Sequence, residues 1–114
     1  MSVLGLSILL VSAQTTQTPS EFVSTRRAYI SCVRTKAIYF ERARETVAST
    51  IDGAFAACAE ERARHFLAIV DAQEKTSLSE ETKADRRDAV VKLTDDSLRE
   101  ELTAELMQTR VEKR

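Results

Sequence analysis

Apolar side chains recur at helical spacing along most of the chain after residue 20. At about 100° per residue, one face of a first helix over residues 21–44 and one face of a second helix over residues 49–73 are apolar. Ser49 and Asp52 resemble a capping box at the start of the second helix. A turn at residues 45–48 would bring the two faces together as an antiparallel hairpin. The first face holds Phe22, Tyr29, Cys32, Phe40, Ala43 and Val47, and the second holds Ile51, Ala54, Phe55, Cys58 and Ile69.

The two cysteines occupy matching positions in this hairpin. Cys32 and Cys58 are equally far from a turn centred near residue 45, about 20 Å along each helix at 1.5 Å per residue. This symmetry predicts a structural disulfide, and it places Tyr29 and Phe55 one turn before each sulfur, where their rings would shield the bridge. The alternatives are two free buried thiols and a regulatory or intermolecular bridge. A redox C-x-x-C motif and a set of four zinc ligands are both absent from the sequence.

A third helical region follows the hairpin. Residues 77–80, Ser-Leu-Ser-Glu, spell a capping box, so a helix is expected to begin near Leu78 or Ser79. Residues 94–97, Thr-Asp-Asp-Ser, interrupt its apolar face and could cap a separate last helix, so the pattern leaves one helix or two open. That face holds Ala84, Val91, Leu98, Leu102 and Leu106.

These elements predict an all-α domain. Residues 21–76 would form the hairpin, and residues 77–114 would be the C-terminal helical region of the same domain. We expect that region to pack on a small-residue face of the second helix, giving a three-helix bundle with the second helix in the middle. The alternative is that the leucine stripe Leu98, Leu102 and Leu106 is an interaction face for a partner chain. The small-residue face holds Ala56, Ala59, Ala63, Leu67 and Val70.

The first thirteen residues have the pattern of a secretory signal. The run VLGLSILLV at residues 3–11 precedes Ser12 and Ala13, and Val11 and Ala13 fit the small-residue pattern that signal peptidase reads. We therefore expect residues 1–13 to be a signal peptide, residues 14–20 (QTTQTPS) to be a flexible lead, and the mature protein to be periplasmic or secreted. The run is too short to be a membrane anchor, which needs about 20 apolar residues. Because no Lys or Arg precedes the apolar run, a buried or disordered apolar N-terminus is the alternative.

Composition and charge exclude several classes of protein. Two glycines and one proline are too few for the turns of an all-β fold. The 17 Lys and Arg residues balance 18 Asp and Glu residues, which leaves no electrostatic footprint for nucleic acid or an anionic membrane.

The sequence also offers little catalytic chemistry. His65 is the single histidine, so a histidine metal cluster is excluded; it is either a pH switch or a half-exposed residue between the helices. Adjacent carboxylates such as Glu60 and Glu61 point about 100° apart on a helix and do not converge. We expect no catalytic residue, metal site or cofactor.

The segment over residues 22–70 resembles small uncharacterised secreted proteins of Gram-negative bacteria. The resemblance is carried by Tyr29-x-x-Cys32, by Phe55-x-x-Cys58 and by the following residues 59–62, Ala-Glu-Glu-Arg. It implies an exported helical protein and no particular chemistry. The format is also similar to mitochondrial coiled-coil-helix proteins, although those carry twin cysteine pairs and this chain has one.

These observations predict a non-enzymatic protein-interaction or structural module. Its partner would be an unidentified protein or a second copy of the chain. An acid- or stress-responsive periplasmic chaperone and an inhibitor of an envelope enzyme are the alternative functions. Protonation of the carboxylates would leave the chain strongly cationic in acid, which is the basis for the chaperone alternative.

Overall fold

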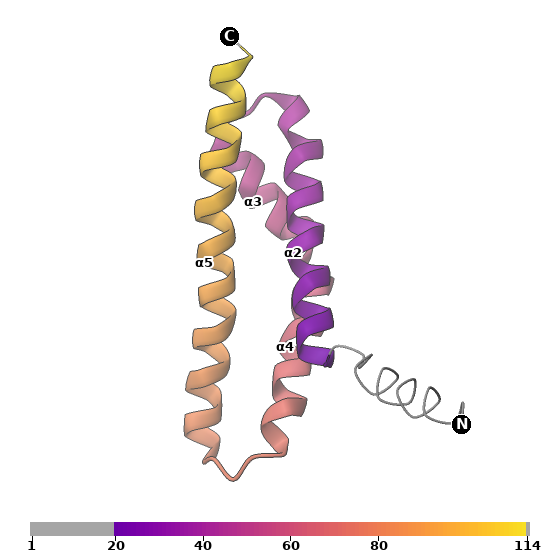
Figure 1. Cartoon of the computed structure of the whole chain (residues 1–114), viewed down its shortest axis with the longest axis vertical. Helices are drawn as coiled ribbons and strands as arrows, with labels where there is room; N and C mark the ends of the chain where they lie inside the picture. Colours follow the sequence, from indigo (N-terminus) through magenta and orange to yellow (C-terminus); the bar gives the residue numbers. More distant parts are fainter. Residues whose placement is uncertain (1–19, 114) are drawn as a thin grey trace, which may run out of the picture.

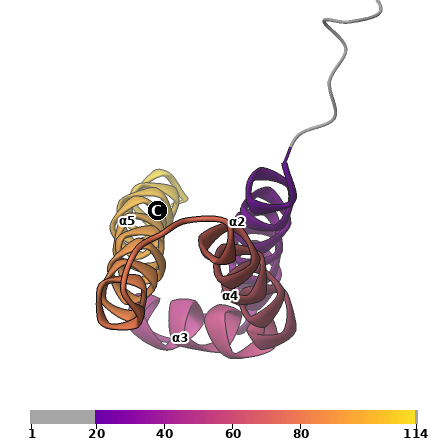
Figure 2. The same cartoon turned by 90° about the horizontal axis from the view of Figure 1, so that it is seen from below.

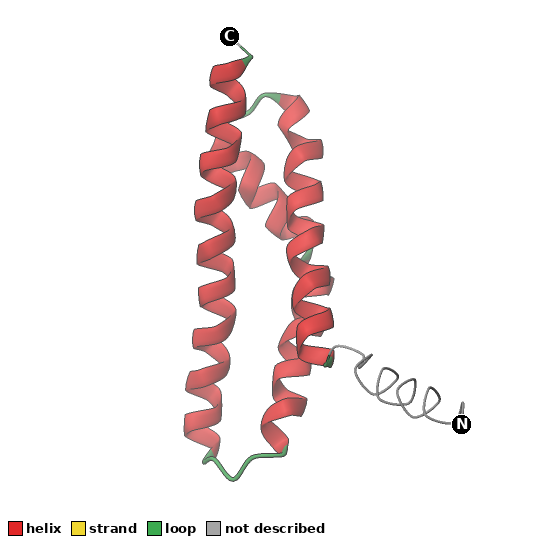
Figure 3. Cartoon of the chain, in the orientation of Figure 1, coloured by secondary structure: helices red, strands yellow, loops and turns green. Residues whose placement is uncertain are grey.

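The computed structural model describes residues 20–113, and this part of the chain is all-α. The expected signal peptide at residues 1–13 and most of the expected lead lie outside the described residues. The helices are α2 (Glu21–Phe40), the 3-10 helix η1 (Glu41–Ala43), α3 (Val47–Ala57), α4 (Ala59–Glu74) and α5 (Glu80–Glu112). Figure 3 shows that only short loops separate them. None of the described helices combines the length and apolarity needed to cross a bilayer.

Hydroxyl side chains fix where three of the helices begin. Ser20, Thr46 and Ser79 accept hydrogen bonds from the backbone N–H groups three residues later, at 3.2, 3.1 and 3.2 Å. The expected cap at Ser49 is therefore wrong, because Thr46 already caps α3 and the helix begins at Val47. The third region begins at Glu80, slightly later than expected, because Ser79 is its N-cap.

The second helix is not continuous, which corrects the sequence interpretation. It breaks at Cys58, whose N–H bonds to the carbonyl of Phe55 at 3.1 Å, three residues back instead of four. Figure 1 shows the result: α3 begins behind α5 and crosses toward α2, and α4 then continues along α2. No glycine or proline marks this break in the sequence.

The third region is one helix. Residues 94–97 continue α5 without interruption. The Thr94 hydroxyl donates to the carbonyl of Val90 at 3.2 Å, within the helix, and Asp95 is engaged by residues of other helices. Of these four residues Asp95 joins α5 to other helices, and of the two alternatives that the sequence left open, one helix is correct.

Helices α2, α3 and α5 share one core. The buried cluster takes residues from α2, from α3 and its junction with α4, and from α5: Tyr29, Val33, Ala37, Ile51, Ala54, Cys58, Leu98, Leu102 and Leu106. Seen along the long axis, α3 spans between α5 on one side and α2 with α4 on the other (Figure 2). The long helices α2 and α5 run in the same direction, so their C-terminal ends lie at the same end of the molecule (Figure 1).

The docking side of α5 differs from the expected one. The small-residue face of the second helix is open, with Leu67 62% exposed and Ala56, Ala59 and Ala63 also exposed. The leucine stripe of α5 packs instead on the same seam that holds the cysteines. Larger apolar side chains lie on that seam, so it buries more area than an alanine face could.

Candidate functional site

The predicted disulfide is present between Cys32 and Cys58, with the two Cα atoms 6.0 Å apart. It ties the middle of α2 to the junction of α3 and α4. The rings of Tyr29 and Phe55 meet edge to face with centroids 6.3 Å apart. Tyr29 is fully buried and Phe55 partly so, and the guanidinium of Arg99 lies 4.6 Å above the Phe55 ring. The predicted pairing of the two cysteines is confirmed, and the two aromatic rings named with it contact each other.

The Tyr29 hydroxyl begins a polar link across three helices. It donates to one oxygen of Asp95 on α5, and Arg62 on α4 donates to the other oxygen from Nη2 at 2.8 Å and Nε at 3.2 Å. Burial, followed by the hydrogen bond to Asp95, raises the pKa of Tyr29 far above its ordinary value. The phenol therefore remains a hydrogen-bond donor at every physiological pH and joins α2 to α5 through Asp95.

His65 is fully buried, in contrast to the half-exposed position expected for it. Its ring lies between those of Phe22 and Tyr29, at centroid distances of 5.3 and 6.3 Å, and its Nδ1 is 3.3 Å from the Thr25 hydroxyl. Burial and the charge of Arg26 lower the pKa of His65, and Asp95 opposes them. The imidazole is therefore neutral near pH 7.

One group of potential metal ligands is found among the described residues. The sulfurs of Cys32 and Cys58 and a carboxylate oxygen of Glu61 lie within 4.8 Å of one another. Metal ligation by cysteine requires a thiolate, and both sulfurs are joined in the disulfide. The group is therefore no metal site in this oxidised form.

The leucine stripe on α5, whose alternative role was an interaction face, is part of the core. Leu98, Leu102 and Leu106 are 3%, 1% and 5% exposed, so they pack within the molecule as expected. The opposite side of α5 carries the exposed apolar residues Leu93, Met107 and Val111. With Ala104 they form what we call the outer face, defined by Leu93, Ala104, Met107 and Val111.

Sequence reasoning missed this outer face although the signal was present. Leu93 and Met107 are two heptads apart, and Ala104 and Val111 are one heptad apart. The two pairs alternate, because Met107 lies three residues after Ala104 and four before Val111. This is the spacing of a coiled-coil seam. The stronger leucine stripe on the other side masked this weaker pattern.

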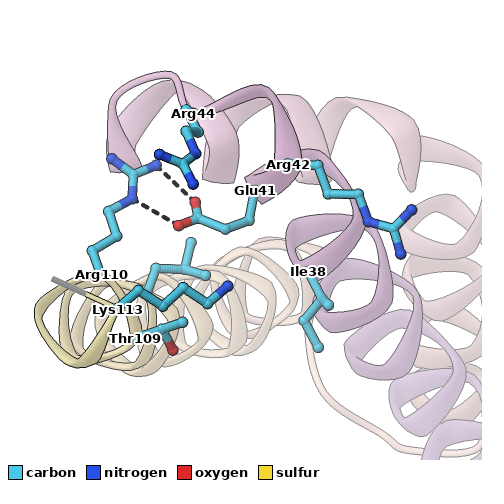
Figure 4. Close-up of a pocket in the computed structure, with 8 residues that line it drawn as sticks. Ile38, Glu41, Arg42, Arg44, Thr109, Arg110 and Lys113 are labelled. Atoms are coloured by element: carbon cyan, nitrogen blue, oxygen red, sulfur yellow. Dashed lines mark hydrogen bonds and ion pairs between the residues drawn. The ribbon is translucent and has the colours of Figure 1, made fainter.

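A second missed feature is a pocket at the end of the molecule where α2 and α5 both terminate. It has a volume of about 700 Å³. We call it the cationic pocket; it is lined by Ile38, Glu41, Arg42, Arg44, Leu106, Thr109, Arg110 and Lys113. Figure 4 shows Arg44, Arg110 and Lys113 gathered around Glu41, with Arg42 extending away from them.

Glu41 and Arg110 form the fixed part of this pocket. Arg110 donates to both carboxylate oxygens of Glu41 at 2.7 Å and also to the carbonyl of Glu45. The hydrogen bond from Arg110, reinforced by the charges of Arg110, Lys113 and Arg44, lowers the pKa of Glu41. The carboxylate is therefore ionised near neutral pH and neutralises one of the four cations.

Comparison with protein-family models, with curated proteins and with solved structures finds no match to this chain.

Proposed function

We propose that this protein is a non-enzymatic interaction module that works in the periplasm or outside the cell and binds a helical protein partner through the outer face of α5. The expected signal at residues 1–13 supports export. The Cys32–Cys58 disulfide is compatible with an oxidising compartment, where such bonds persist.

The observation that carries the proposal is that α5 has two apolar faces. Its inner face is used within the molecule, whereas on its outer face Leu93, Met107 and Val111 are 68%, 56% and 61% exposed. Isolated exposed apolar residues are ordinary, but a set repeated at heptad spacing along one helix forms a seam for a second helix. Ser97 and Glu100 interrupt the seam, and polar residues at such positions select the register and the partner.

The rest of the fold supports α5 for this role. Arg34 on α2 pairs with both Glu101 and Glu105, and Arg62 on α4 pairs with Asp95. A helix of 33 residues held on its inner side by packing and charge presents its outer side as a rigid, straight surface. A surface ordered in advance loses little conformational entropy on binding.

Site-specific photo-crosslinking in the native cell tests this proposal. A photoreactive amino acid at position 93 or 107 should give a discrete adduct with one protein of a different mass. Position 67 on α4 is the matched control, because Leu67 is also apolar and 62% exposed. Equal adducts from positions 67 and 93, or none from positions 93 and 107, would contradict the proposal.

An acid-responsive chaperone is a second candidate, favoured by where the ion pairs lie. Among residues 20–113, each ion pair that joins two different helices has one partner on α5, whereas the disulfide holds α2 to the α3–α4 junction covalently. Protonation of the carboxylates would weaken the attachment of α5 and leave the remaining helices joined. Release of α5 would expose the Leu98, Leu102 and Leu106 stripe to unfolded clients.

Neighbouring aspartates provide a matched test of the chaperone candidate. Asp95 pairs across helices with Arg62, whereas Asp96 pairs within α5 with Lys92. Dye binding and suppression of client aggregation should increase between pH 7 and 4. Asp95→Asn should move that increase to higher pH, and Asp96→Asn should not. Cooperative loss of helix without dye binding or client protection would rule the chaperone out.

A further inference from the structure

The cationic pocket carries more positive charge than its own carboxylate balances. Arg110 is occupied by Glu41 through two hydrogen bonds. Arg44 and Lys113 form no ion pair within residues 20–113, and Arg42 only lies 5.6 Å above the Tyr39 ring. Four cations against one carboxylate leave a local excess of three positive charges, in a chain whose total charge is −1.

The excess positive charge is confined to one concave site, the cationic pocket. A polyanion such as nucleic acid requires a basic stripe along a surface, and the balanced charge of the whole chain offers none. A pocket of about 700 Å³ falls within the size range of small-molecule sites, roughly 300–1,000 Å³. The charge distribution therefore suits one small anion.

Two of the eight residues that line the pocket are apolar. Leu106 is 5% exposed and continues the core into the pocket, and Ile38 stands at its edge with 67% of its surface exposed. Figure 4 shows the Lys113 side chain extending beneath Glu41 on the side of Ile38. An occupant that pairs with the cations would therefore place any apolar extension against Ile38 and Leu106.

The backbone at Arg44 adds a second observation. Arg44 has φ 56°, and within the described residues it is the only non-glycine residue with a positive φ. Glycine or asparagine is the ordinary residue for this left-handed position, and a long side chain is uncommon there. The turn after η1 does not itself require the guanidinium of Arg44. This guanidinium points toward Glu41 and Arg110 (Figure 4).

We propose that the cationic pocket binds a small amphiphilic anion, with its carboxylate or phosphate head held by Arg44 and Lys113 and its hydrocarbon tail on Ile38 and Leu106. The ligand is of the fatty-acid or lysophospholipid class. The site is separate from the outer face of α5, so it goes beyond the proposed function and stands or falls independently of it.

Titration calorimetry on the disulfide-bonded protein tests the site with defined probes. Decanoate and decyl phosphate, both kept below micelle formation, should bind with dissociation constants below about 1 mM. Acetate and inorganic phosphate, which lack the tail, and decanol, which lacks the charge, should bind at least about tenfold more weakly. Tighter binding of decyl phosphate than of decanoate would identify the lysophospholipid source, and the reverse would identify the fatty acid.

Charge variants locate the binding. Arg44→Gln with Lys113→Gln should weaken decanoate binding about tenfold or more, because each cation contributes a charge-assisted contact. Lys36→Gln with Arg86→Gln is the matched control, since both cations are exposed and lie outside the pocket. Ile38→Ser, a change at an exposed position, should reduce binding of decanoate and leave acetate unchanged.

Three outcomes would overturn the proposal. One is the absence of binding by either amphiphile at 1 mM or below. Another is equal binding of decanoate by the pocket variant and the control variant. The third is binding to anionic lipid vesicles without binding to the monomeric amphiphiles, which would indicate a membrane surface in place of a small-molecule site.

Discussion

Reduction of the Cys32–Cys58 disulfide should cost this protein a large part of its stability. The bridge closes a loop of 26 residues in sequence separation. On the chain-entropy relation, closing a loop of that length lowers the entropy of the unfolded state enough to stabilise the fold by about 3.5 kcal/mol at 25 °C. Domains of this size are stable by about 5–15 kcal/mol in total, so the loss is substantial.

Urea unfolding followed by circular dichroism measures this loss. The free energy of unfolding of the oxidised wild type is compared with that of wild type held in reductant. In a parallel thermal scan, the midpoint of unfolding should fall by about 15–25 °C on reduction. The Cys32→Ala/Cys58→Ala variant adds a packing control. Because Cys58 is completely buried, the alanine variant should be less stable than the reduced wild type by the cost of the void.

The result that would refute the reasoning is a loss below about 1 kcal/mol on reduction with an unchanged urea m-value. The hairpin would then hold its geometry in the unfolded ensemble without the bridge. A smaller loss accompanied by a changed m-value would instead place the effect in the compactness of the unfolded chain.

Three further predictions concern the core, α3 and pH. Leu102→Ala should lower the unfolding free energy by about 2–5 kcal/mol in urea, since Leu102 is 1% exposed in the shared core. Gly53→Ala should raise the thermal midpoint, with a gain of about 0.5–1 kcal/mol, because Gly53 lies inside α3 and a Cβ there would meet Phe40 at an ordinary 3.5 Å. Stability should fall with acid in two stages. Burial lowers the pKa of His65 in the folded protein, so below pH 6.5 the unfolded chain binds a proton at His65 more readily and the free energy of unfolding falls. Below pH 4.5 Glu41, whose pKa is also lowered in the folded protein, has the same effect. Unfolding free energies measured from pH 8 to 3 check both stages. His65→Phe should flatten only the first stage, the one that begins below pH 6.5. If the free energy of that variant falls with the same slope in the first stage, a group other than His65 titrates in it.

The helices and the cysteine pairing follow from local sequence. Apolar spacing of three and four residues places Tyr29, Cys32, Phe55 and Cys58 on matching faces, and this depends only on helical geometry and on the position of one turn. Moving the cap of the second helix from Ser49 to Thr46 leaves residues 44–46 as the connection, still centred on residue 45, the centre from which the pairing was predicted. The pairing is therefore insensitive to the mistaken cap at Ser49.

Tertiary contacts decided the features on which the proposed function rests. The break at Cys58 carries no glycine or proline signal, and it lies where α3, coming from α5, reaches the disulfide to α2. The sequence also did not reveal which of the two apolar faces of α5 packs in the core. Two apolar stripes on one helix compete for the same core, and the larger leucines occupy it.

The sequence by itself determined that this chain forms helices and how its two cysteines pair, because periodicity acts over short distances. The three-dimensional arrangement alone determined that α2 and α5 end side by side. Arg44 and Lys113 are far apart in the sequence and meet only because these helices run parallel (Figure 1). The physical reason is that a pocket of like charges requires packing energy from elsewhere to hold it together, and here the shared core of α2, α3 and α5 supplies that energy.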